Sequence, residues 1–445
     1  MKVRNSKMIL NGFLAPGGYD ARAWRLPSSR SAEIGSLGVV KSIVQSYEKA
    51  KLDSVFIADI PGADFLLDGD LALGSPYESI STMGALTAVT KKIGIIGTLS
   101  TTFNQPFTIA RQLAALDLLS GGRVGWNIVT STFGADAHGI ELPTKADRYR
   151  RAAEFVNLVR CLWSAWSDDA IIDDKQQGVW LDRAKVKLIK HQGEFFTAKG
   201  VANIPRSPQG HPVLVQAGQS SDGLNFGAEF AEVIYTTQPD REKAVQYYRD
   251  QKERVAHFGR DPEHVKVLPG IIPYVGQTDA EARDLFESIV SFMDFGDLRD
   301  RFRVMFSVNL DDLPLEKPVP AERFDVWKTH PSGPRILAYK TVATTPGNTL
   351  RDLLINFSSA MGHNLVCGSA ESIADQMVSW FEGYACDGFS LNAPTFPNSV
   401  DGICKYLVPI LQERGYANQD YRADTLRGNL GLPHPPAWDK VAEIH

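Results

Sequence analysis

The chain has 445 residues, 43% of them hydrophobic, and its 47 basic and 52 acidic side chains give a net charge of −5. A mildly acidic chain without a block of lysines and arginines argues against nucleic acid or an anionic membrane as the main partner. No apolar stretch approaches the roughly 18 residues of a membrane-spanning helix, and polar residues interrupt the amino-terminal run too early for a signal peptide.

Short apolar runs that end in polar residues or glycine recur along the chain, and each has the length of a buried strand. Between them lie segments with apolar residues at spacings of three and four, which is typical of amphipathic helices; examples are 34–51, 107–119 and 149–163. In chain order the strand-like runs are 8–14, 54–60, 93–99, 123–129, 212–218, 232–237, 265–275 and 388–394.

Eight alternations of strand and helix predict an α/β fold, a closed (β/α)8 TIM barrel. A doubly wound sheet is the alternative, but it would place a GxGxxG motif after the first strand, and "NGFLAPGGYD" (11–20) lacks one. We expect a single barrel domain over 1–445, with insertions after strands four and seven at about 163–211 and 276–387 and a tail at about 417–445. The first insertion is expected to run over the barrel, the second to form a lid, and the tail to pack on a second subunit.

The carboxyl ends of the strands form the active face of such a barrel. Asp59, Thr98 and Asn127 stand at three of these ends, and Thr130 and Ser131 follow Asn127 closely. The sequence shows no set of His, Cys, Asp and Glu at metal-ligand spacing and no GxSxG nucleophile motif, so no metal site is expected. A site of neutral hydrogen-bonding groups predicts that a cofactor supplies the chemistry.

The stretch "VQAGQSSDG" (215–223) is predicted to be a turn from a strand into a helix. Its small residues let the backbone approach a ligand, and the first N–H groups of the helix have no intrahelical partner, which suits a phosphate. The alternative is that Ser220 is an ordinary N-cap. Tyr149, in the first turn of another predicted helix, either packs in the core or points its hydroxyl at the same phosphate.

Five segments resemble the bacterial-luciferase-like flavin monooxygenases, in the branch of nitrilotriacetate and dibenzothiophene-sulfone monooxygenases. They are "FIADI" (56–60), "GTLSTTFNQPFTIARQLAALDLLSGGRVGWNIVTS" (97–131), "ADRYRRAAEFVNLVRCLWSAW" (146–166), "PRSPQGHPVLVQAGQSSDG" (205–223) and "VPILQERGYANQDYRADTLRGNLGL" (408–432). The resemblance extends over about 8–433, and SGGRxxWNxVTS is its most specific motif. It implies a barrel that binds reduced FMN at its carboxyl face and uses O2 to oxygenate a substrate. A separate NAD(P)H-dependent flavin reductase would supply the reduced FMN.

The resemblance also implies roles for individual residues. Asp59 and Thr98 would lie near the flavin ring and ribityl chain, and Asn127 would lie beneath the ring. Trp126 points the opposite way along the strand and is expected in the core. The residues implied in binding the phosphate are Tyr149, Gly218, Gln219 and Ser220.

Two departures from the family pattern affect the site. Lys145 stands where relatives have a histidine in an H-x-x-R-Y pattern, and we expect it to meet the phosphate as a point charge. Thr132 replaces a histidine that some relatives place near the reacting oxygen, which leaves no assigned acid or base. His138 and His363 are catalytic candidates only by their position in the sequence, and the alternative is that they are ordinary surface or core histidines.

Aromatic residues near the strand ends favour a flat, (hetero)aromatic substrate, and those expected to line its pocket are Phe13, Phe56 and Phe133. A polycarboxylate would instead require cations at the mouth, for which the candidates are Arg22, Arg25 and Arg30. Three other functions stay open: a flavin- or heterocycle-degrading enzyme of the same family, a deazaflavin-dependent reductase, and a flavin-storage protein.

The expected context is a cytoplasmic enzyme. Four cysteines without CxxC spacing fit reduced thiols rather than disulfides. The expected partners are the flavin reductase, the small-molecule substrate and O2, and the expected assembly is a homodimer or homotetramer.

Overall fold

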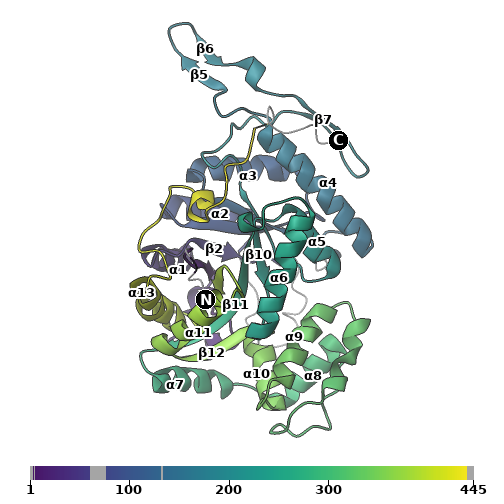
Figure 1. Cartoon of the computed structure of the whole chain (residues 1–445), viewed down its shortest axis with the longest axis vertical. Helices are drawn as coiled ribbons and strands as arrows, with labels where there is room; N and C mark the ends of the chain where they lie inside the picture. Colours follow the sequence, from purple (N-terminus) through teal and green to yellow (C-terminus); the bar gives the residue numbers. More distant parts are fainter. Residues whose placement is uncertain (1–3, 5, 61–76, 132–133, 438–445) are drawn as a thin grey trace.

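The computed structural model describes residue 4 and residues 6–60, 77–131 and 134–437. Its centre is a closed barrel of parallel strands, in which each strand pairs with the next around the ring and the last pairs with the first (Figure 1). All eight predicted runs form these strands, so the predicted barrel is confirmed. In order around the barrel the strands are β1 (Ile9–Phe13), β2 (Ser54–Ile57), β3 (Gly94–Ser100), β4 (Val124–Val129), β9 (Val213–Gln216), β10 (Val233–Thr236), β11 (Lys266–Gly276) and β13 (Gly388–Leu391).

Helices surround the barrel and bury their apolar faces against the outside of the strands. The sequence shows why α3 begins and ends where it does: Pro106 occupies its first turn, and Gly121, with a φ of 74°, ends it in the left-handed region. The outer helices are α1 (Leu37–Lys49), α2 (Ser79–Val89), α3 (Pro106–Ser120), α4 (Lys145–Ser164), α5 (Ser221–Phe230), α6 (Arg241–His257) and α11 (Ala370–Glu382). After β13 the chain forms α12 (Asn398–Gly402), a π-helical turn (Ile403–Leu407) and α13 (Val408–Glu413). Short 3-10 turns lie at Ala23–Arg25, Ser31–Glu33, Arg183–Lys185, Pro262–His264 and Ala321–Lys328. None of the described helices has the length and apolarity needed to cross a membrane.

Trp126 and Asn127 lie on opposite faces of β4, one packed against the outer helices and the other directed into the barrel. The Trp126 ring is fully buried between strand and helix, packs against Phe155 and Trp163, and donates from Nε1 to the Leu99 carbonyl at 3.1 Å. Trp126 is therefore a core residue, as predicted. Because side chains alternate along a strand, its neighbour Asn127 faces the barrel interior.

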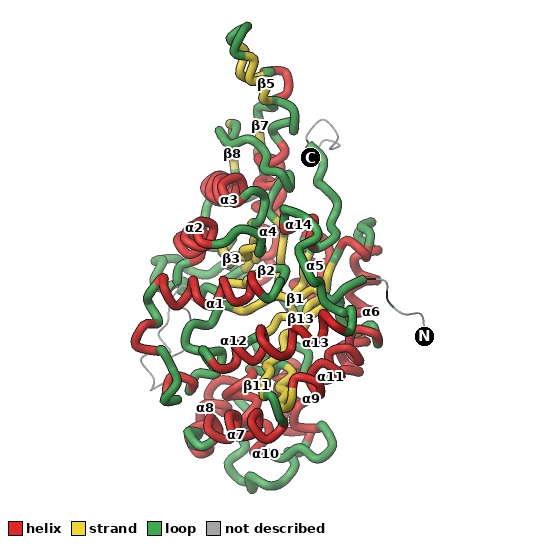
Figure 2. Tube along the Cα trace, turned by 90° about the vertical axis from the view of Figure 1, so that its left-hand side faces the viewer, coloured by secondary structure: helices red, strands yellow, loops and turns green. Residues whose placement is uncertain are grey.

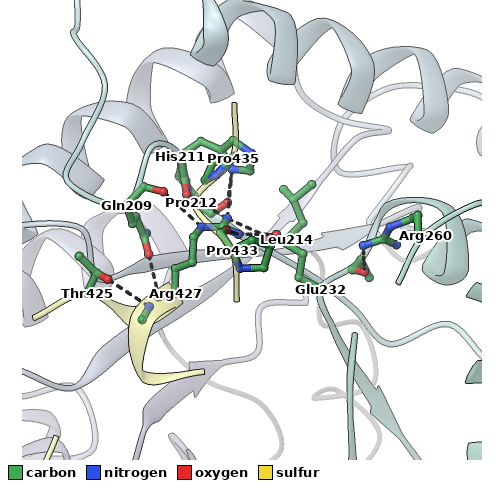
Figure 3. Close-up of polar contacts among 12 residues, drawn as sticks. Gln209, His211, Pro212, Leu214, Glu232, Arg260, Thr425, Arg427, Pro433 and Pro435 are labelled. Atoms are coloured by element: carbon green, nitrogen blue, oxygen red, sulfur yellow. Dashed lines mark hydrogen bonds and ion pairs between the residues drawn. The ribbon is translucent and has the colours of Figure 1, made fainter. Parts of the chain in front are cut away.

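The carboxyl-terminal tail closes the amino end of its own barrel. Leu426, in α14 (Leu426–Asn429), belongs to the same apolar cluster as Ile9, Ile96 and Val213 inside the barrel. Arg427 donates to both oxygens of Glu232, and its backbone N–H donates to Gln209 Oε1 at 3.0 Å (Figure 3). These residues find partners within the same chain, and packing of the tail on a second subunit stays a prediction.

The first insertion forms two small hairpins, with β5 (Ile171–Asp174) paired to β6 (Val179–Leu181) and β7 (Ile189–Gln192) paired to β8 (Thr197–Gly200). We expected this segment to run over the barrel. Figures 1 and 2 instead show β5 and β6 projecting away from the body of the molecule as an arm.

The second insertion has a small hydrophobic core of its own, which includes Phe302, Phe324, Tyr339 and Leu353. It also contains a strand that the sequence analysis missed, β12, which continues the sheet by pairing with the second half of β11 from Ile271 to Gly276. The elements are α7 (Asp279–Val290), α8 (Phe295–Phe306), α9 (Gly333–Thr344), α10 (Leu350–Ala360) and β12 (Asn364–Ser369).

Candidate active site at the carboxyl face

Thr98 and Asn127 lie side by side on β3 and β4, where they are partners in the strand register. The Thr98 hydroxyl donates to the Ile57 carbonyl at 2.8 Å and accepts from Asn127 Nδ2 at 3.0 Å. This leaves Asn127 Oδ1 buried without a hydrogen-bond partner among the described residues. Because an unsatisfied buried carbonyl is costly, this oxygen is a candidate acceptor for a ligand.

Asp59 lies just beyond β2, and its carboxylate accepts from the backbone N–H of Ser79, at the start of α2, at 2.9 Å. Partial burial raises the pKa of Asp59, and the neighbouring carboxylate of Glu78 raises it further, against the lowering effect of the Ser79 bonds. The bond to Ser79 fixes the side chain at the edge of the site.

A cavity of about 270 Å³ opens between the ends of β2, β4 and β9 and the first turns of α4. One wall of this cavity contains Gln216, whose Oε1, like Oδ1 of Asn127, is buried without a hydrogen-bond partner in the part of the chain that the structure describes. Gln216 was not among the predicted cofactor-binding residues, although its place at the end of a predicted strand was a signal that could have selected it. The lining consists of Asp59, Ile60, Ile128, Val129, Thr130, Ser131, Tyr149, Gln216, Ala217 and Gly218.

The turn from β9 into α5 is tightly built and needs its glycine. A Cβ on Gly218 would overlap the Gln216 amide and lie 3.1 Å from the Gly223 Cα. Ser220 caps α5 by accepting from the Gly223 N–H at 3.3 Å, so the simple N-cap interpretation of this serine is realised. The cap occupies one donor only, and the turn remains able to receive an anion at the start of the helix. Gln219 lies half-buried in the same turn.

Tyr149 and Lys145 reach this turn from α4. The Tyr149 hydroxyl lies beside Gly223, where a Cβ would be 3.0 Å away, and its ring packs edge-on against Phe226. Lys145 Nζ forms an ion pair with Asp222 at 2.9 Å, in the first turn of α5. The structure thus brings the predicted lysine to the predicted phosphate turn, but its ammonium group faces a carboxylate there.

The predicted aromatic residues divide between the mouth and the interior of the barrel. Phe56 belongs to the barrel core, where its ring packs against Tyr235 with centroids 4.7 Å apart. Phe13 is half-buried above it, 5.5 Å from Phe56 and edge-on to Tyr19 at 5.2 Å. Phe133 lies outside the described residues.

The two candidate histidines occupy separate places, and neither lines the 270 Å³ cavity. His138 is exposed and stacks flat on Phe103, with centroids 4.3 Å apart. His363 lies against Gly270 of β11, and burial, assisted by the charge of Arg335, lowers its pKa to about 3. No group of three or more potential metal ligands comes together among the described residues.

These groups fit a planar heterocycle that carries a phosphate. Asn127 and Gln216 offer unsatisfied carbonyl oxygens to N–H groups, and the glycine turn before α5 offers backbone donors to an anion. The cavity that joins Gln216 to this turn is also lined by the apolar side chains of Ile60, Ile128 and Val129.

Comparison with known proteins agrees with this geometry. A family model described as luciferase-like monooxygenase matches residues 23–385. N-acetyl-S-(2-succino)cysteine monooxygenase of Bacillus subtilis is 36% identical over 98% of this chain and 99% of its own. Nitrilotriacetate monooxygenase component A of Aminobacter aminovorans is 35% identical over 97% and 98%. A solved structure of riboflavin lyase with modified FMN and riboflavin superposes with a TM-score of 0.82, at 30% identity and 97% coverage of both chains.

Proposed function

Because the chain belongs to the luciferase-like monooxygenase family, we propose that it is the oxygenase component of a two-component flavin-dependent monooxygenase. It would use reduced FMN and O2 to oxygenate or cleave a small organic molecule. The observation that carries the proposal is the cavity itself, which runs from the unsatisfied oxygen of Gln216 to the glycine turn at the start of α5.

Two groups of residues would bind FMN, one at its ring and the other at its phosphate. Asn127 and Gln216 would accept hydrogen bonds from the ring, and their burial makes those bonds worth more than they would be in water. The backbone after Gly218 would bind the phosphate, together with the hydroxyl groups of Ser220 and Tyr149. Bound reduced FMN supplies the electrons and the site of reaction with O2.

The side chains of the protein would then position the flavin ring and shield it from water. Apolar side chains in the cavity wall exclude water from the ring, which protects reactive species from side reactions. Asp59, held by Ser79, keeps a carboxyl group with a raised pKa at the edge of the site. Thr98 fixes the Asn127 amide so that its carbonyl remains available.

Supply of the reduced flavin would fall to a separate NAD(P)H-dependent reductase. The cavity would hold reduced FMN, and the resemblance to the family implies that a second protein delivers the electrons. The name of the nitrilotriacetate relative, component A, likewise describes one part of a larger system.

The proposal is tested by titrating the protein with oxidised and with chemically reduced FMN and following the flavin absorbance and fluorescence. Reduced FMN is expected to bind more tightly than the oxidised form. Gly218→Val is expected to weaken binding of both forms by about tenfold or more, because the new side chain overlaps Gln216. The matched control is Gly35→Ala, where an added Cβ meets no atom within 4 Å.

Addition of a flavin reductase and NADH to the FMN-loaded protein is expected to give O2-dependent turnover of a substrate. Absence of binding of either flavin form would overturn the proposal. Substrate turnover without O2 would instead assign the chain to a reductase.

A further inference from the structure

Three polar side chains meet above the carboxyl ends of β1, β10 and β11, on the part of the rim away from the phosphate turn. Tyr19 belongs to the loop after β1, and its ring lies 6.3 Å from that of His363. His363 covers Gly270 of β11, where a Cβ would overlap its ring. The stem of Arg335, from the first turn of α9, lies near Gly362, and Gly362 in turn lies near Thr237, just past the end of β10. We call Tyr19, Arg335 and His363 the rim triad.

Arg335 brings to the triad a positive charge that no carboxylate of the described residues neutralises. Its Nη1 donates to the Met361 carbonyl at 2.7 Å, and none of the carboxylates in the described residues lies within ion-pair distance of it. Two basic residues of the same insertion, Arg323 and Lys340, pair with Asp312 and Asp325. A cation held at the mouth of a barrel without a counter-ion is a site for an anion.

The other two members of the triad add hydrogen-bond donors and no negative charge. Burial raises the pKa of Tyr19 to about 12 despite the opposing effect of Arg335, so the hydroxyl keeps its proton. His363, with its pKa lowered by burial to about 3, is uncharged at neutral pH, and its Nδ1 lies against the backbone of Gly270. The adjacent Asp20 is turned away, because its oxygens accept from the Arg22 backbone and from Tyr274.

The arginines that the sequence offered for anion recognition have other partners. Arg30 forms an exposed ion pair with Glu33 at 2.6 Å. Arg25 donates to the Phe292 carbonyl at 3.2 Å, and Arg22 donates to the hydroxyl of Ser358. The candidate cation at this part of the rim is thus Arg335, which comes from the second insertion and is remote from β1 in the sequence.

Apolar surface adjoins the triad. Phe13 packs edge-on against Tyr19, and Phe56 lies below Phe13. A molecule with an apolar body and one anionic end would match both parts, with the body on Phe13 and the anionic end at Arg335.

We propose that Arg335, assisted by Tyr19 and His363, binds an anionic group of the substrate, a carboxylate or a sulfur oxyacid. This inference rests on the proposed function, because it assigns the triad to the substrate of that reaction. It also narrows the substrate class from small organic molecules in general to those with a negatively charged end beside an apolar body.

The test uses two probes with the same body and different charge, 4-(methylthio)benzoate and 4-(methylthio)benzamide. Their binding to the full-length protein is measured by isothermal titration calorimetry, with and without FMN. The wild-type chain is expected to bind the carboxylate about tenfold or more tightly than the amide. Arg335→Gln is expected to remove that preference without changing the affinity for the amide, and Arg335→Lys to retain part of it because lysine keeps the charge but not the fork of donors. Tyr19→Phe is expected to lose a few-fold in carboxylate affinity.

Lys340→Gln is the matched control, since it removes a positive charge from the same helix, at a residue paired with Asp325. It is expected to bind both probes like the wild-type chain. Urea unfolding checks that Arg335→Gln remains folded. A wild-type chain without preference for the carboxylate, or an Arg335→Gln variant that keeps the preference, overturns the inference. Because the probes are also titrated without flavin, a failure of FMN to bind would count against the proposed function alone.

Discussion

At the scale of single residues, the most informative atoms are Asn127 Oδ1 and Gln216 Oε1, two buried oxygens that accept no hydrogen bond from the described residues. Leaving such a group unsatisfied costs about 1–3 kcal/mol of folding free energy. The two residues lie on the neighbouring strands β4 and β9, and under the proposed function this cost is offset when the oxygens accept hydrogen bonds from a ligand. These oxygens therefore allow function to be separated from stability by substitution.

Replacement of Gln216 with methionine, which has a similar shape, removes the unsatisfied carbonyl. We expect the flavin-free protein to become more stable by about 1 kcal/mol, because a buried polar group is lost, while the affinity for reduced FMN falls about tenfold. Urea unfolding and flavin titration measure the two effects. Gln251→Met is the control: Gln251 is equally buried, but its amide donates to the Leu224 carbonyl at 3.1 Å, so we expect lower stability and unchanged FMN affinity. A Gln216→Met protein that binds FMN normally would contradict the role of this oxygen.

Residue-scale prediction from the sequence succeeded where the backbone geometry is local. Asn127 could be placed inside the barrel because Trp126 precedes it in a strand, and alternation fixes their opposite directions. The positions of His138 and His363 could not be deduced in this way, because loop geometry and the second insertion decide which side chains meet them. For the same reason the position of Arg335 at the rim could not be predicted, because this residue belongs to α9, which is far in the sequence from any predicted strand end.

At the scale of elements, the junction of α4 with α5 contains the proposed phosphate turn and a pair of opposite charges. Asp222 stabilises the start of α5, yet it also holds the Lys145 ammonium at 2.9 Å and places a negative charge beside the proposed phosphate site. Both side chains are about half exposed, so their pairing contributes little to stability. We expect this ion pair to act mainly on the affinity for negatively charged ligands.

Replacement of Asp222 with asparagine should free Lys145 for the phosphate. We expect FMN to bind about three- to tenfold more tightly at low salt, and the gain to shrink as ionic strength rises. Riboflavin, which lacks the phosphate, is the matched ligand and should show no gain. Fluorescence titration of both flavins at two salt concentrations provides the measurement. An equal gain for riboflavin would show that the charge of Asp222 acts on the ring rather than on the phosphate.

Helices and strands could be predicted where their own sequence shows a regular apolar pattern. The eight barrel strands were found because each is a short apolar run between turn residues, and α1, α3 and α4 because their apolar residues recur at helical spacing. β12 was missed because "NLVCGS" is short and only partly apolar, and it exists through its pairing with the second half of β11. That pairing is a tertiary contact, which a local pattern does not reveal.

At the scale of the whole molecule, the carboxyl-terminal tail is attached to the amino end of the barrel by an ion pair between Arg427 and Glu232, which directly precedes β10. Arg427 and Glu232 are almost completely buried, and Gln209, His211 and Pro433 supply further hydrogen-bond partners to the guanidinium (Figure 3). Burial alone would raise the pKa of Glu232, but the adjacent Arg427 outweighs it and lowers that pKa to about 2. No sequence pattern indicated this partner, because 195 residues separate the two side chains.

Replacement of Arg427 with alanine should therefore destabilise the barrel by about 3–5 kcal/mol at pH 7, because it leaves a buried carboxylate without its partner. In the wild-type chain the Glu232 pKa lies below its ordinary 4.5, so this ion pair is complete above pH 4.5 and is lost only as the pH falls towards 2. In the variant, burial would raise the Glu232 pKa, so the carboxyl becomes protonated on mild acidification and the difference in unfolding free energy between the two proteins should shrink from pH 7 to pH 5. Urea unfolding at both pH values measures this difference, and the contributions of groups that titrate alike in both proteins cancel.

The control is Lys92→Ala, which breaks the exposed ion pair between Lys92 and Asp424 of the same tail and should leave stability unchanged. A loss of stability as large as that of Arg427→Ala would mean that attachment of the tail, rather than the buried pair, sets the stability.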